Sequence, residues 1–68
     1  MEKGKKLYYV TIAGDVYTYI ITDITDEFIF VAWEEDTSVK TIFPIEQAKF
    51  LIKKCATLED AQREARKR

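Results

Sequence analysis

The sequence predicts an α+β fold, in which a four-stranded antiparallel β-meander is followed by one or two C-terminal α-helices. Runs of β-branched and aromatic residues, separated by short polar turns, fill the first two thirds of the chain, and apolar residues recur at helical spacing after Pro44. With 68 residues, the chain forms one small domain. A small SH3-like barrel with a helical tail is the alternative fold, because a short meander can curl on itself.

The expected strands share a high content of Val, Ile, Thr, Tyr and Phe, which favour extended backbone; they span residues 7–13, 16–24, 28–33 and 38–43. Gly14-Asp15 separates the first two segments by two residues, which predicts a tight hairpin. The meander is thus expected over residues 7–43, after a flexible basic N-terminus at residues 1–6. Residues 44–68 form the helical segment.

Both faces of this sheet are expected to carry large apolar side chains. If Ala13 pairs with Val16, one face is wholly apolar or aromatic, and the other is mixed and holds the candidate interface residues Tyr9, Thr11, Thr18 and Ile20. In the third strand, the loop at 24–27 leaves open whether Phe28, Phe30 and Ala32 or Ile29, Val31 and Trp33 join a given face. One helix can cover one face. The other face could be covered by a second copy of the chain, by the helix at 58–68, by curling of the sheet into a barrel or by a different partner, and a homodimer is the simplest solution.

The first helix is expected at about residues 45–55, with an apolar stripe formed by Ile45, Ala48, Leu51, Ile52 and Cys55. Thr57 with Asp60 resembles an N-terminal capping box and predicts a second helix over residues 58–68, unless the two helices are one that bends near Thr57. Phe50 lies off the apolar stripe among polar neighbours. It is either a singly exposed aromatic residue or an anchor of a protein interface.

Charge is divided between the two parts of the chain. Residues 7–39 hold seven acids and no Lys or Arg, whereas the chain from Pro44 onward holds seven bases and four acids. A first alternative function is therefore nucleic-acid binding by the basic C-terminal helix, through Lys53, Lys54, Arg63, Arg66, Lys67 and Arg68. The second alternative is an acidic inhibitor that mimics nucleic acid through Glu34, Glu35 and Asp36.

The meander that turns into a helix at Phe43-Pro44-Ile45-Glu46 resembles, in outline, single-strand-binding modules of the coactivator, Whirly and PUR types. Those modules form their binding surfaces from β-strands. This resemblance implies that nucleic acid would meet the sheet, but a strand region without Lys or Arg repels phosphate. Any nucleic-acid contacts are therefore expected on the basic helix.

The residue inventory argues against enzymatic chemistry. The chain has no His and a single Cys, so we expect no catalytic residue, no metal site and no cofactor, and Cys55 is expected to be a reduced, inert thiol.

No stretch approaches the ~20 apolar residues of a membrane span, and we expect a cytoplasmic protein that does not bind membranes. The expected function is a non-enzymatic binding or self-association module that acts through protein–protein contacts with itself or another protein.

Overall fold

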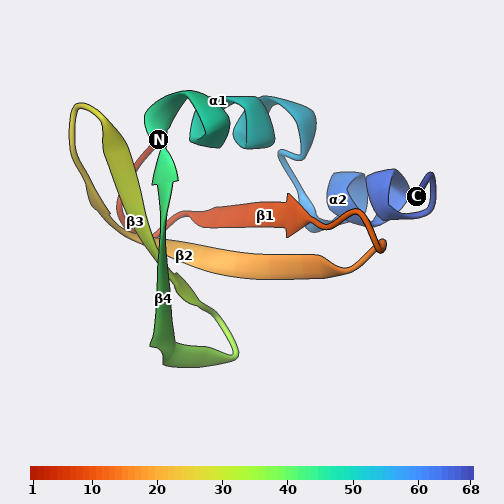
Figure 1. Ribbon diagram of the computed structural model, residues 1–68, viewed down its shortest axis with the longest axis horizontal. Helices are drawn as coiled ribbons and strands as arrows, with labels where there is room; N and C mark the ends of the chain where they lie inside the picture. Colours follow the sequence, from red (N-terminus) through yellow and green to blue (C-terminus); the bar gives the residue numbers. More distant parts are fainter.

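The computed structural model describes all 68 residues as an antiparallel sheet with two helices packed against it (Figure 1). The elements are β1 (Lys6–Val10), β2 (Val16–Ile24), β3 (Phe28–Trp33), β4 (Asp36–Pro44), α1 (Ile45–Lys54) and α2 (Leu58–Ala65). The strand order β1-β2-β3-β4 confirms the predicted meander. Since β1 and β4 do not pair with each other, the sheet stays open and the alternative barrel is not formed.

The element boundaries differ slightly from the predicted ones. Strand β1 begins at Lys6, and the preceding residues already pair with β2, because Gly4 N–H donates to the carbonyl of Ile21 (2.8 Å) and Ile21 N–H donates to that of Lys5 (2.9 Å). Strand β4 begins two residues earlier than expected, at Asp36. The helical segment contains two helices, and α1, the longer, has ten residues, so neither helix is long and apolar enough to cross a membrane.

The predicted two-residue turn at Gly14-Asp15 is wrong. Gly14 N–H donates to the carbonyl of Thr11 (3.0 Å), and Thr11 N–H donates to that of Asp15 (2.9 Å), so the loop consists of Ile12, Ala13 and Gly14. Gly14 has a φ of 89°, the left-handed conformation that closes a three-residue hairpin loop. As a result, Val10 pairs with Val16, and Ile12 lies at the loop tip with 90% of its surface exposed.

This change of register exchanges the faces assigned to β1. Tyr9 lies opposite Tyr17, and Tyr8 lies opposite Thr18. Val16 was expected to pair with Ala13 but pairs with Val10, which is a register shift of three residues. Because strand side chains alternate between the two faces, an odd shift moves every β1 side chain to the other face relative to β2. The predicted grouping of Tyr9 with Thr18 and Ile20 on one face is therefore wrong.

A bulge in β2 decides the face of each β3 residue. Ile21 pairs with Val31, but Asp23 pairs with Phe30, so Thr22 is an extra residue in β2 and its hydroxyl donates to the carbonyl of Phe30 (3.0 Å). The two faces can now be named. The inner face carries Leu7, Ile21, Ile29, Val31 and Phe43, whereas the outer face carries Val10, Ile20, Phe28, Phe30, Ala32 and Ile42.

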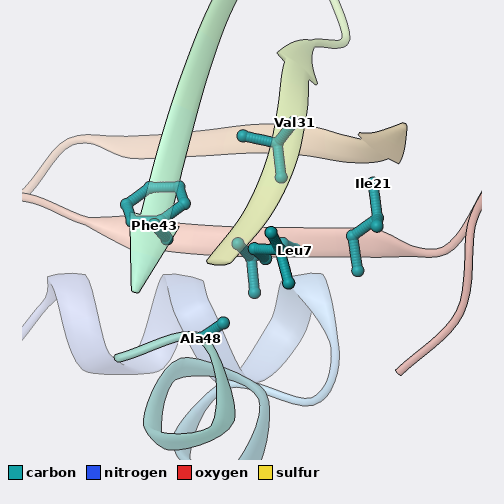
Figure 2. Packing of buried hydrophobic residues seen from close by; sticks show 6 residues of the cluster. Leu7, Ile21, Val31, Phe43 and Ala48 are labelled. Carbon is teal, nitrogen blue, oxygen red and sulfur yellow. The ribbon is translucent and has the colours of Figure 1, made fainter. Parts of the chain in front are cut away.

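Helix α1 covers the inner face. Its buried Ala48 packs against the inner-face residues, and Ile45, Leu51 and Ile52 complete this core, as the predicted stripe required. Figure 2 shows Leu7, Ile21 and Ala48 pointing into the space between the sheet and α1. Cys55 is the one residue of the predicted apolar stripe that does not join this core. It follows the last residue of α1 and packs against Val10 and Ala61 instead.

Helix α2 covers only one end of the outer face. The Thr57 hydroxyl accepts from Asp60 N–H (3.1 Å), which confirms the predicted N-terminal cap. The helix then packs Ala61 and Ala65 near Val10 and Cys55, at the hairpin end of the sheet. The sheet is strongly twisted, so β4 runs steeply across the direction of β1 and β2 (Figure 1). Its beginning lies far from both helices, and its end leads into α1.

Candidate protein interface

A group of exposed apolar side chains lies on the outer face, beyond the part that α2 covers. Phe30 and Ile42 are directly opposite each other on β3 and β4, and Phe28 is the next outer residue along β3. These three residues, here called the β3–β4 patch, expose 38% (Phe28 and Phe30) and 48% (Ile42) of their surface. The β-forming side chains that make these strands also leave apolar surface in contact with water.

An ion pair borders the middle of the outer face. Lys6 Nζ lies 2.8 Å from Glu34 Oε1, and because Lys6 is on β1 and Glu34 follows β3, the pair spans β2. The hydrogen bond to Glu34 raises the pKa of Lys6. Charged groups thus border the outer face near β1, whereas the outer face of β3 and β4 keeps its exposed apolar residues.

Strand β4 is an uncovered edge of the sheet. Seven of its nine residues are exposed, one is half-buried and only Phe43 is buried. Val39 and Ile42 are its two exposed aliphatic side chains. An edge strand of this length offers unpaired backbone groups as well as apolar side chains to a partner.

The candidate residues chosen from the sequence do not share one surface. Tyr9 is half-buried on the inner face, with its ring centroid 5.8 Å from that of Phe43. Thr11 lies in the hairpin loop, where its hydroxyl accepts from Asp15 N–H (3.0 Å). Thr18 and Ile20 are half-buried on the outer face. The sequence reasoning missed the β3–β4 patch, although the i, i+2 spacing of Phe28 and Phe30 did indicate a shared face.

Phe50 is exposed, at 59% of its surface, which agrees with its position off the apolar stripe of α1. Lys54 Nζ lies 5.6 Å from the centroid of its ring, a cation–π contact within the helix. Because α1 lies on the inner side of the sheet, Phe50 and the β3–β4 patch point to opposite sides of the molecule. They cannot contribute to one flat interface.

An acidic pocket opens beside the start of β2 and the end of β3. Its volume is about 320 Å³, and its lining includes Tyr17 and Trp33, whose ring centroids lie 6.2 Å apart, together with Asp15, Glu34 and Glu35. Burial is the main cause that raises the pKa of Tyr19, the inner-face neighbour of Tyr17. Because Lys6 neutralises Glu34, the remaining negative charge of the pocket comes from Asp15 and Glu35.

Most cations of the C-terminal segment are paired with acids of the same segment. Glu64 lies at the centre, with Lys54, Lys67 and Arg68 at 3.2, 3.7 and 3.8 Å. The hydrogen bond from Lys54 is the main cause that lowers the pKa of Glu64. Arg63 contacts Glu59 and Asp60 at 3.5 and 3.3 Å. Of the six candidate nucleic-acid contacts, Lys53 and Arg66 alone form no ion pair.

The acids of the β3–β4 turn are also partly engaged. Asp36 Oδ1 accepts hydrogen bonds from Ser38 N–H (3.1 Å) and from the Ser38 hydroxyl (2.6 Å), and these bonds lower the pKa of Asp36. Glu34 is paired with Lys6. Glu35 is therefore the only one of the three acids with no partner in the chain.

No group of three or more Cys, Asp or Glu side chains lies close enough together to hold a metal ion. The thiol of Cys55 is buried between α1 and α2, and burial is the main cause that raises its pKa. The chain matches no protein-family model, no curated protein and no solved structure.

Proposed function

We propose that the protein is a small non-enzymatic binding module that acts through protein–protein contacts and forms a homodimer. The observation that carries this proposal is the β3–β4 patch, three large apolar side chains that stay exposed beside an uncovered edge strand. Burying apolar surface contributes about 25 cal/mol per Å². Contiguous apolar surface of this kind is typical of interaction sites.

Neither helix covers this patch. Helix α1 packs on the inner face, and α2 reaches only the hairpin end of the outer face through Ala61 and Ala65. In the proposed dimer, a second molecule covers Phe30 and Ile42.

Nucleic-acid binding by the basic helix has weaker support. Four of its six candidate cations form ion pairs with Glu59, Asp60 or Glu64, which reduces the charge available to phosphate. The other alternative, an acidic inhibitor that mimics nucleic acid, has similarly weak support, because two of its three acids, Glu34 and Asp36, already have partners within the chain. Both functions, and the cytoplasmic location, stay predictions from the sequence.

The mass of the protein in solution tests the proposal. Light scattering coupled to size exclusion, over a hundredfold range of concentration, is expected to give a mass that rises from 8.0 kDa towards twice that value. The double variant Phe30→Thr/Ile42→Thr removes most of the patch while keeping residues that favour strands. It is expected to weaken association at least about tenfold, which corresponds to about 1.4 kcal/mol.

Ile12→Thr is the matched control, because Ile12 is also an exposed apolar residue but lies at the hairpin tip, away from β3 and β4. It is expected to leave the association unchanged. A constant mass of 8.0 kDa up to the highest concentration would contradict the proposal, as would a dimer weakened equally by the control and the double variant.

A further inference from the structure

The acidic pocket beside Trp33 exists because β2 begins beyond the end of β3. Glu34 N–H donates to the carbonyl of Thr18 (3.0 Å), and the chain then turns away into β4. Val16 and Tyr17 pair with β1 on one side and with no strand on the other. The space left open there has a volume of about 320 Å³, which is within the ~300–1,000 Å³ typical of small-molecule sites.

Two aromatic side chains line this pocket and are held in place by their neighbours. The ring centroids of Tyr17 and Trp33 lie 6.2 Å apart with the ring planes at 72°, so the two rings form a corner. Tyr17 also packs against Tyr19 (6.5 Å), which in turn packs against the buried Phe43 (5.7 Å). The corner is therefore anchored to the core, while Tyr17 keeps 36% of its surface exposed.

The same pocket contains negative charge that the chain does not neutralise. Glu34 is paired with Lys6 at 2.8 Å, but Asp15 and Glu35 form no ion pair. The face of an aromatic ring is also electron-rich and attracts cations. Two carboxylates beside two aromatic rings thus favour a positively charged ligand and disfavour phosphate or carboxylate groups.

We propose that this pocket binds an alkylated ammonium group, as in choline or in a trimethylated lysine side chain. No three carboxylates of the chain lie close enough together to hold a metal ion. The methyl groups of a quaternary ammonium carry its charge without donating hydrogen bonds to water, so they can pack against Tyr17 and Trp33. Asp15 and Glu35 supply the opposite charge at the rim.

This site is separate from the surface proposed for self-association. The pocket lies at the end of β3, at Trp33, whereas Phe28 of the β3–β4 patch lies at the start of that strand. Ligand binding is therefore expected in the monomer as well as in the dimer, and the inference does not depend on the proposed function.

The fluorescence of Trp33 tests the proposal, because Trp33 is the only Trp of the chain and lines the pocket. Choline chloride is titrated into the full chain, with sodium chloride keeping the ionic strength constant. The fluorescence is expected to change and to saturate with a Kd of about 1–10 mM. The neutral isostere 3,3-dimethyl-1-butanol has carbon in place of the quaternary nitrogen and is expected to bind at least about tenfold more weakly.

Titration with Nα-acetyl-trimethyllysine amide distinguishes the two sources of the ammonium group. Binding at least as tight as that of choline assigns the pocket to a modified protein side chain. Weaker binding than that of choline assigns it to a free small molecule.

The double variant Asp15→Asn/Glu35→Gln removes the two unpaired charges of the pocket, both at exposed positions. It is expected to weaken choline binding at least about fivefold. The matched control is Asp26→Asn/Glu27→Gln, which removes two exposed acids from the turn at the opposite end of β3 and is expected to leave binding unchanged.

Tyr17→Leu removes one ring of the corner and keeps Trp33 as the reporter, and it is expected to weaken choline binding at least about fivefold. Circular dichroism checks that this variant folds; should it not fold, the charge variants and the neutral isostere decide.

Three results would overturn the proposal: a fluorescence response to choline no larger than that to sodium chloride, equal binding of choline and its isostere, or equal weakening by the pocket variant and the control.

Discussion

The two edge strands of the sheet, β1 and β4, are built from similar β-forming residues but have very different surroundings. Strand β1 buries Leu7 under α1 and Val10 under α2, one on each face. Strand β4 is almost twice as long, yet it buries Phe43 alone. Both helices lie beside β1, whereas the lower part of β4 projects into open space (Figure 1).

The order of the elements along the chain explains this difference. Helix α1 starts directly after β4 at Ile45 and runs back over the inner face, so only the last residues of β4 lie near it. The chain then crosses to the outer face at Cys55, and α2 packs beside Val10. A short chain with two helices can protect one edge of an open sheet, and here it protects β1.

The largest expected difference in unfolding free energy is between two similar substitutions, one of an aliphatic residue on β1 and one of an aliphatic residue on β4. Leu7→Ala leaves a cavity under α1 and is expected to lower the free energy of unfolding by about 2–5 kcal/mol. Ile42→Ala on β4 removes exposed surface and is expected to change it by less than about 0.5 kcal/mol. Urea unfolding at a concentration that keeps the chain monomeric measures both. Equal losses would show that β4 is packed as tightly as β1.

The second prediction concerns the hairpin that joins β1 to β2. Gly14→Ala places a Cβ at a φ of 89° and within 3.3 Å of the Ala65 carbonyl, so it strains the loop and pushes it against the end of α2. The expected loss of stability is about 1–2 kcal/mol. Gly4 has a similar φ of 86°, but a Cβ added there would have no neighbouring atom within 4 Å. Gly4→Ala therefore adds backbone strain without crowding, and we expect it to lower the stability of the protein less than Gly14→Ala does. The two losses being equal would mean that contact with α2 contributes nothing.

A smaller effect is expected at the cap of α2. Thr57→Ala removes the acceptor for Asp60 N–H and is expected to destabilise the protein by about 1 kcal/mol, because one end of α2 then has an unpaired donor. Thr57→Ser keeps the acceptor and should stay within a few tenths of a kcal/mol of the unmodified protein. Thermal unfolding compares them. If the Ser variant loses as much as the Ala variant, the methyl group of Thr57 matters more than the cap.

The smallest expected effect is the pH dependence contributed by Glu64. Its pKa is lowered in the folded chain, first by the hydrogen bond from Lys54, so its contribution to stability is present above its unfolded pKa and is lost as pH falls through the folded value. The unmodified protein should therefore lose more stability in acid than Glu64→Gln does, with the difference growing as the pH falls below 4.5, the ordinary pKa of a glutamate side chain. Urea unfolding over a series of acidic pH values measures this difference. Identical profiles would show that the three cations around Glu64 contribute no net stabilisation.

The comparison of the edges also explains which parts of the candidate site could be predicted. The presence of large apolar side chains on both faces of the sheet could be predicted, because the strands are rich in apolar residues at both odd and even positions. Phe50 could be predicted to be exposed from its angular position on the helix. The β3–β4 patch could not be singled out, because its location depends on the bulge at Thr22, and one Thr in a run of strand formers gives no local signal for an extra residue.

The sequence alone determined the kind and order of the elements, because β-branched runs, the helical spacing after Pro44 and the Thr57 cap act over a few residues. Only the tertiary structure decided which side chains share a face. Strand side chains alternate with a period of two, so the placement of Gly14 third in its loop, and of one extra residue at Thr22, determines the side of every neighbour. Those choices depend on packing between α1 and the inner face, and such contacts join residues that are far apart in the chain.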